Sequence, residues 1–345
     1  MANYAKAKKL STLASSTTCK IHRDKGQIWT PSRHSNHDFI GKRLHRDHRT
    51  DFFNLTIEVK DLKKANFEGG FKLAQLLTAP MLSLLKTDVQ AWNEWKAEWD
   101  KLAPDTMSPN FFGANLEDAN LAGANLDDLY LEDANFAGAN LTGASFYDAT
   151  LHGANFAGAN LAGANLDNAH LGGANFAGAN LTSAHLYDLY LKEANLAGAN
   201  LTGANLDRVD LCGANLTGAN LAGAELHEVE LIKANLTSAS LKGASLVNIG
   251  FQDANLAFAN LENATIEFIS LDDANMAGAS LRNAFLDNLH LDAHELEALT
   301  SASSFTGLRV GKDCYRLERD PYKEINIGHH LEDLAKLEQL SLPLR

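Results

Sequence analysis

A bulky apolar residue stands at every fifth position of the sequence from Phe111 to Leu291, without a slip. These 37 positions hold 29 Leu, 6 Phe, Ile266 and Met276. Two residues before each of them, from Ala114 on, 29 of 36 positions are Ala. A period of five fits neither the 3.6-residue turn of a helix nor the two-residue alternation of a strand. A short fixed period is typical of a solenoid, in which each turn stacks on the next and only the stack buries a core.

The seven positions that depart from Ala indicate how many units make one turn. They all share one phase of a 20-residue period, and they are Leu129, Leu189, Val209, Val229, Ile249, Ile269 and Leu289. Four pentapeptides therefore make one coil with four non-equivalent faces. We expect the central Leu and Phe residues to point inward, with Ala at the inward corners. Residues 111–291 then form about nine coils, a rod of ~43 Å at the ~4.8 Å spacing of neighbouring strands.

Acidic residues gather on one side of this predicted rod. We number the faces by their central residues, each followed by multiples of 20: face one from Leu116, face two from Leu121, face three from Leu126 and face four from Leu131. Faces three and four hold 19 of the 22 carboxylates between residues 114 and 293, against three basic residues, Lys192, Arg208 and Lys233. Charge keeps a repetitive β-rod soluble and its edges unpaired. Drift among duplicated repeats is an alternative. A partner that binds the acidic side, or another copy or domain that packs on the plain side, explains the asymmetry directly.

We therefore take faces three and four as the candidate recognition surface. The segment LYDLYL at 186–191 lies there, and its tyrosines flank Asp188 in an aromatic and acidic pairing suited to binding. The candidate binding residues are Asp127, Asp128, Tyr130, Glu132, Asp133, Tyr147, Asp148, Asp167, Tyr187, Asp188, Tyr190, Glu193, Asp207, Asp210, Glu228 and Glu230.

The segments outside the main rod predict five parts in all. We expect a basic arm at 1–36, a degraded repeat coil at 37–69, a helical insertion or cap at 70–110, the main β-helix at 111–293, and a C-terminal cap at 294–345. In the insertion, Trp92, Trp95 and Trp99 have helical spacing, and Pro80 is expected to separate two helices. An apolar stripe at 329–340 predicts a terminal helix that either caps the last coil or forms a homodimer contact.

The N-terminal stretch from Cys19 to His48 contains pairs of residues at a spacing that zinc tolerates. They are Cys19 and His22, His34 and His37, and His45 and His48. The Lys and Arg residues of the same stretch instead suit nucleic acid, an acidic membrane surface or the acidic faces of the same molecule. In the rod, the histidines are dispersed without a Ser or Cys partner at the spacing of a triad. We therefore expect a non-enzyme without a cofactor.

Other features bear on location. No stretch approaches the ~18 consecutive apolar residues of a membrane helix. The N-terminus lacks the apolar region of a secretory signal. Three widely separated cysteines make no disulfide framework. A cytoplasmic location fits these features, and export as an effector is the alternative.

The A-N-L-x-x pattern over some 180 residues resembles the pentapeptide repeat family. The resemblance implies a right-handed quadrilateral β-helix, often dimeric through its C-terminal region. Its quinolone-resistance members are understood to mimic duplex DNA and bind DNA gyrase or topoisomerase IV. This chain departs from them by its length, its basic arm and its Trp-rich insertion. Two hypotheses follow: an acidic rod that binds a basic protein such as gyrase, or a scaffold or adaptor in which the N-terminal region binds and the β-helix is a spacer.

Overall fold

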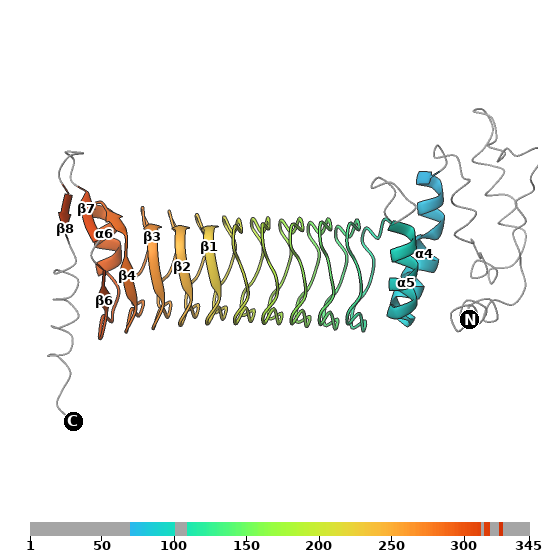
Figure 1. Cartoon of the computed structure of the whole chain (residues 1–345), viewed down its shortest axis with the longest axis horizontal. Coiled ribbons are helices and arrows are strands. Elements are labelled where there is room, and N and C mark those ends of the chain that lie inside the picture. The colour runs from blue at the N-terminus through green and yellow to red at the C-terminus, as the bar shows by residue number, and fades with distance from the viewer. Residues whose placement is uncertain (1–69, 101–108, 312–313, 318–323, 327–345) are drawn as a thin grey trace, which may run out of the picture. The chain divides into compact units, whose positions relative to one another are not determined.

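A computed structural model describes residues 70–100, 109–311, 314–317 and 324–326 (Figure 1). The predicted arm at 1–36, the coil at 37–69 and the terminal helix at 329–340 lie outside the described residues. The chain divides into two compact units, of which one contains Leu84–Asn93 together with the repeat region from Asn110 on.

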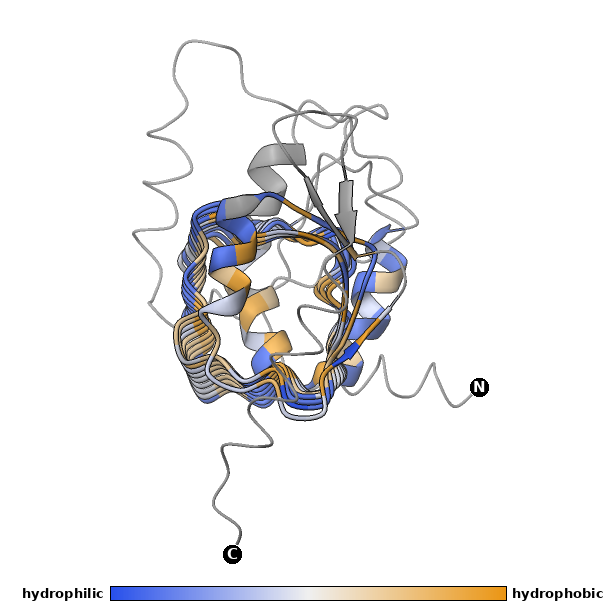
Figure 2. Ribbon diagram, turned by 90° about the vertical axis from the view of Figure 1, so that its left-hand side faces the viewer, coloured by the Kyte–Doolittle hydropathy of each residue, from blue (hydrophilic) through white to orange (hydrophobic). Residues whose placement is uncertain are grey.

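The repeat region is a four-sided parallel β-solenoid, as predicted. Each coil makes four parallel bridges to residues 20 positions later, for example Asn115 to Asn135 and Asn120 to Asn140. Viewed along the axis, the stacked coils superimpose into a four-sided outline (Figure 2). The predicted count of four pentapeptides per coil is therefore confirmed.

A β-turn forms most of the corners. The amide of Ala114 donates to the carbonyl of Phe111 at 2.9 Å, and Gly113 between them has a φ of 62°. This is a type II turn, whose third residue needs a positive φ. All 36 equivalent positions from 113 to 288 have a positive φ, and Gly fills 16 of them. The frequent Gly two residues after the central Leu thus follows from the turn.

The corner between faces three and four is different. Where this corner carries Ala, the turn closes, as Ala149 donates to Phe146 and Ala169 to Leu166, both at 3.0 Å. The larger Leu129, Leu189 and Val209 make no such bond among the backbone hydrogen bonds of the described solenoid. A bulkier inward side chain therefore holds this corner open.

Further along the rod, the same corner straightens into a parallel sheet. Its strands are β1 (Glu225–Glu230), β2 (Ser245–Gly250), β3 (Thr265–Ser270), β4 (Phe285–Asp287) and β6 (Arg309–Val310), in that order. In this region the strands run across faces three and four, and their backbones pair with those of the adjacent coils along nearly the whole of both faces.

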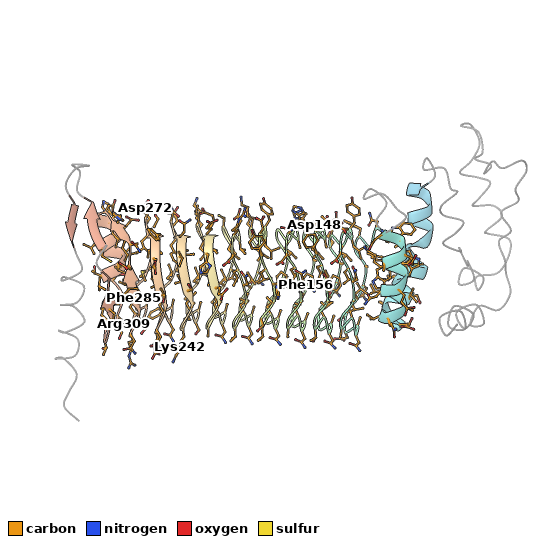
Figure 3. All side chains as sticks on the ribbon, in the orientation of Figure 1. Asp148, Phe156, Lys242, Asp272, Phe285 and Arg309 are labelled. Carbon is orange, nitrogen blue, oxygen red and sulfur yellow. The ribbon has the colours of Figure 1, made fainter. Side chains whose placement is uncertain are left out.

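The core is a set of inward columns, one for each face. Every central residue from Phe111 to Leu291 is at most 2% exposed. Phe136, Phe156 and Phe176 stack with ring centroids 4.8 Å apart, which is the spacing of successive coils. Figure 3 shows Phe156 between the two edges of the rod.

Asparagine ladders run along faces one and two. On face one, Asn155 Nδ2 donates to Asn135 Oδ1 at 3.0 Å, and Asn175 donates to Asn155 at the same distance. Each acceptor oxygen also takes an N–H two residues later, as Asn155 does from Ala157 at 3.2 Å. The matching positions on faces three and four hold varied residues such as His185 and Glu225. The first two faces are therefore fixed by structure, whereas the other two are free to vary.

One more coil follows Leu291. Helix α6 (Ala293–Thr300) takes the place of its face one, and the chain then pairs again, with Ser280 bridging Ser304. Strand β5 (Leu289–Leu291) pairs in parallel with β7 (Cys314–Leu317), which pairs antiparallel with β8 (Glu324–Asn326). The helix lengthens this coil by four residues, so the five-residue period does not reveal it.

Helix α4 (Gly70–Thr87) runs through Pro80, so the predicted break there is wrong. The break falls at Asp88 instead, before α5 (Val89–Asp100). The Asp88 carboxylate accepts the amide of Ala91 at 3.0 Å and begins the new helix, whereas proline removes only one helical donor and bends a helix without having to end it.

Two side chains of α5 close the open edge of the first coil. Trp92 Nε1 donates to the carbonyl of Asn125 at 2.6 Å, and Asn93 Nδ2 donates to that of Gly123 at 2.8 Å. Asn93 Oδ1 accepts the amide of Asn125 at 2.8 Å. These bonds replace the ones that a preceding coil would make, as a solenoid end requires. Trp95 and Trp99 stack on each other, with ring centroids 5.2 Å apart.

We predict that the corner between faces three and four accepts a larger residue than the other corners do. Ala169→Val has Leu189 as its neighbour on the next coil, so unfolding free energy should fall by less than about 1 kcal/mol. Ala174→Val, at a closed corner of face one, should cost about 1–3 kcal/mol through overpacking. Urea denaturation of both variants tests this, and equal losses would contradict the open corner.

We predict that Asn93→Ala exposes the first coil's edge. Two backbone groups lose their partners at about 1–3 kcal/mol each, and the uncapped edge should pair with other molecules. Light scattering during mild heating should show association that rises with protein concentration. Gln90→Ala, an exposed change on the same helix, serves as the control. An Asn93→Ala variant that associates no more than this control would refute the cap.

Candidate functional site

The sixteen predicted binding residues all lie on faces three and four, and none of them is buried. Figure 3 shows Asp148 and Asp272 along one edge of the rod and Lys242 along the opposite edge. The structure therefore places these side chains on one side of the solenoid; their role in binding stays a prediction.

Aspartate and tyrosine alternate along face three, one residue to a coil. The order is Asp127, Tyr147, Asp167, Tyr187 and Asp207. Asp127 Oδ1 accepts the amide of Tyr147 at 2.9 Å, and Asp167 Oδ1 accepts that of Tyr187 at 2.9 Å. Each carboxylate thus anchors the backbone of the tyrosine on the following coil, so both tyrosines have the same support.

Arg208 lies against the second of these tyrosines. Its guanidinium donates to the Tyr187 hydroxyl at 2.9 Å, and its Cζ is 5.6 Å from the centre of the ring. The Asp188 carboxylate is 3.9 Å from the same guanidinium. The bond to the Tyr187 hydroxyl, followed by the charge of Asp188, raises the pKa of Arg208. Tyr187 and Asp188 therefore form a clamp for a guanidinium group.

Exposed aromatic rings continue from here onto face four. His152 stacks on His170 at 5.9 Å, and His170 stacks on Tyr190 at 5.7 Å between ring centroids. Tyr190 is 52% exposed, so the stack is an accessible platform. Large exposed rings that keep one open side are typical of binding surfaces.

Ion pairs neutralise little of the acidic side. Lys192 lies 3.1 Å from Asp210, which also accepts the amide of Cys212 at 3.1 Å. With 19 carboxylates and three bases, faces three and four keep a balance of −16. Over ~43 Å that is one net charge per ~2.7 Å, against ~1.7 Å in duplex DNA. The rod therefore has more than half the linear charge density of DNA, on one side only.

Asp207, His227 and Ser245 lie in the order of a hydrolase triad. His227 Nδ1 is 3.0 Å from Asp207 Oδ1, and its Nε2 is 3.1 Å from Ser245 Oγ. However, Asp207 Oδ1 has no hydrogen-bond partner, so its short contact with the imidazole is not aligned as a hydrogen bond. A triad needs a directional bond to orient the imidazole. We interpret the group as a polar surface cluster.

The predicted zinc ligands Cys19, His22, His34, His37, His45 and His48 lie outside the described residues. Among the residues that the structure describes, the carboxylates of Asp272, Asp292 and Glu295 come close enough to one another to hold a metal ion. Asp292 and Glu295 form the capping box of α6, and Glu295 also accepts the amide of Leu271 at 2.8 Å. Helix capping accounts for two of the three carboxylates, and the third, that of Asp272, belongs to an exposed residue.

The repeats identify the family. The family profile "Pentapeptide repeats" matches in eight copies between residues 110 and 288, which is more than half of the chain. The chain belongs to the pentapeptide repeat family. Pentapeptide repeat proteins are generally structural or interaction proteins and not enzymes. No curated protein matches the chain.

Solved pentapeptide repeat structures have only partial likeness to this chain. HetL, involved in heterocyst differentiation regulation in the cyanobacterium Nostoc sp. strain PCC 7120, is 29% identical over 49% of this chain and 88% of its own, with a TM-score of 0.29. QnrB1, a plasmid-mediated fluoroquinolone resistance protein, is 22% identical over 53% and 92%, with a TM-score of 0.48. Family membership therefore rests on the repeats. Within the part that the structure describes, no helix is both long and apolar enough to cross a membrane.

Sequence reasoning missed the contacts that cross coils. Arg208 follows Tyr187 by 21 residues, one coil and one residue, and His170 follows His152 by 18. Both contacts join aromatic or charged residues that lie 18 to 21 positions apart in the sequence. The 20-residue period, already clear in the sequence, supplies the signal for finding them.

We predict that Cys212 is a slow thiol. Its burial, followed by the neighbouring Asp210 carboxylate, raises the pKa of Cys212 to about 11. Because the thiolate is the nucleophile, alkylation by iodoacetamide should keep accelerating up to about pH 11. Asp210→Asn removes the negative charge and should speed the reaction at pH 8 by about three- to tenfold.

Mass spectrometry of the peptide that contains Cys212 measures this rate without interference from the other cysteines. Asp253→Asn, an exposed change on the same face, is the control. A rate that levels off near pH 9 would rule out the raised pKa.

Proposed function

We propose that this protein is a non-enzymatic binding rod whose acidic side docks a basic, DNA-binding protein. The observation that carries the proposal is the one-sided charge: 19 carboxylates and only three bases on two adjacent faces. The other two faces bear asparagine ladders that serve the fold itself. Solubility alone does not require this division.

Charge spacing supports a DNA-binding partner. A basic surface that accommodates duplex DNA meets one phosphate charge per ~1.7 Å of helix axis. The rod presents one net negative charge per ~2.7 Å of its length, all on one side. Its carboxylates repeat at the ~4.8 Å spacing of the coils on a backbone that cannot flex independently. Fixed charges lose little entropy on binding, so a rigid acidic rod suits a preformed basic groove.

DNA gyrase is the specific partner that we propose to test. The family includes quinolone-resistance proteins. QnrB1, a fluoroquinolone resistance protein, is among the solved structures that this chain resembles. The chain's length and its helical insertion distinguish it from those proteins.

A matched pair of triple variants tests the acidic side. Asp128→Asn, Glu193→Gln and Glu228→Gln remove three charges from faces three and four. Glu117→Gln, Asp118→Asn and Glu262→Gln remove three from faces one and two. Each set neutralises one Asp and two Glu, and both Asp residues have a positive φ, 58° at Asp128 and 54° at Asp118.

We predict that the unmodified protein inhibits gyrase supercoiling or protects gyrase from quinolone, and that added salt weakens the effect. The variant of faces three and four should lose about tenfold in potency, which is ~0.5 kcal/mol for each removed charge at a solvated interface. The variant of faces one and two should act normally.

Two outcomes contradict the proposal in different ways. No inhibition and no protection removes gyrase as the partner. Inhibition that both variants retain removes the acidic side and favours the adaptor hypothesis, in which the N-terminal region binds. A homodimer through 329–340 stays a prediction, since those residues lie outside the described ones.

A further inference from the structure

The clamp at Tyr187 has a counterpart two coils earlier. Tyr147 and Asp148 precede Tyr187 and Asp188 by 40 residues, so they occupy the same positions on face three. The amide of Tyr147 donates to Asp127 at 2.9 Å, as that of Tyr187 does to Asp167. The φ angles of Asp148 and Asp188 are 54° and 55°. The two sites therefore share the left-handed aspartate and the anchoring carboxylate, although Ala149 closes the corner after Asp148 and Leu189 holds the corner after Asp188 open.

The two sites differ in the residue that lies beside them on the following coil. Asn168 takes the position of Arg208, and both have a φ of 61°. Asparagine has neither the reach nor the charge to cover the ring one coil back. Among the described residues, no hydrogen bond or ion pair involves the Tyr147 hydroxyl or the Asp148 carboxylate. Tyr147 is 42% exposed, and Asp148 is exposed along the acidic edge (Figure 3).

We propose that Tyr147 and Asp148 form an open clamp for an arginine side chain of the partner protein. The inference rests on the proposed function and names the group that is recognised. Arg208 at Tyr187 demonstrates the contacts: a hydrogen bond to the phenol oxygen, a cation over the ring, and a carboxylate beside the guanidinium.

The chemistry of the clamp favours arginine over lysine. An extended guanidinium donates to the hydroxyl while its cationic carbon stays within cation–π range of the ring, whereas an ammonium is a compact, strongly hydrated charge. The surroundings are more acidic than those of the filled clamp. Asp127, Asp128 and Asp167 lie on the two adjacent coils, and the nearest bases of this side, Lys192 and Arg208, belong to later coils. An incoming cation therefore meets no local competitor.

The experiment measures selectivity, which cancels general charge effects. The probes are an acetylated peptide of alternating arginine and glycine and its lysine analogue, which carry equal charge. Isothermal titration at low salt gives a Kd for each, and the ratio of lysine Kd to arginine Kd is the readout. For the unmodified protein we expect a ratio of about two to five, from one exposed cation–π contact.

Three substitutions probe the clamp. Asn168→Arg fills it from within, as Arg208 fills its counterpart, and should bring the ratio close to one. Tyr147→Leu removes the ring and should do the same. Arg208→Asn opens the second clamp and should raise the ratio by about two- to fivefold. Asn263→Arg is the matched control, since it makes the same change at a φ of 60° on face two; its ratio should stay unchanged.

A ratio of one for the unmodified protein, or a ratio that survives both Asn168→Arg and Tyr147→Leu, would overturn the clamp. Gyrase inhibition separates this result from the proposed function. Normal gyrase inhibition by the Asn168→Arg and Tyr147→Leu variants would refute the clamp as a contact for the partner, and it would be consistent with docking on the acidic side. Selectivity that follows the predictions without any gyrase effect keeps the clamp and discards gyrase as the partner.

Discussion

Parallel hydrogen bonding between successive coils is the constraint on which the rest of this structure depends. The amide of Leu116 reaches the carbonyl of Asn135 at 2.7 Å, and nearly the same bond recurs on every face and coil. Such bonding forces residues 20 positions apart into one column. Inward columns must then hold residues that stack, which explains the phenylalanines, and outward columns must hold residues that tolerate a like neighbour at about 4.8 Å. Asparagine satisfies that requirement by bonding its own copies; a column of carboxylates does not.

The acidic side therefore carries an electrostatic cost, because stacking of the coils places like charges close together. Like charges on adjacent coils repel, and the structure relieves part of the repulsion by alternation. Aspartates are interleaved with tyrosines on face three, and Asp127 and Asp167 each turn one oxygen toward an amide of the next coil. Repulsion remains among the rest, and a partner that supplies basic groups would relieve it. Variation and charge occur together at the corner where Leu129, Leu189 and Val209 hold the turn open, because that corner depends least on a fixed sequence.

Sequence alone predicted the solenoid, its four faces and its acidic side, because a strict period maps directly onto space. It failed where the period is interrupted or crossed. Helix α6 shifts the register by four residues, which hides the coil behind it. Pro80 was overrated as a helix breaker, since the capping carboxylate of Asp88 decides where the second helix begins. The pairing of Arg208 with Tyr187 was missed because it links residues that are far apart in the chain and belong to different units of the repeat.

The side of the rod on which acidic residues lie depends on the number of pentapeptides that precede them. Each pentapeptide turns the chain through one side of the square, so inserting or deleting one unit would swing every later residue onto a neighbouring side. The acidic stripe would then break into two stripes at right angles, although composition, net charge and core would hardly change. Gain or loss of a whole coil would only lengthen or shorten the stripe by about 4.8 Å. Length is thus freely adjustable in steps of 20 residues, while direction is protected: the described coils from Phe111 to Leu291 keep the count without a slip.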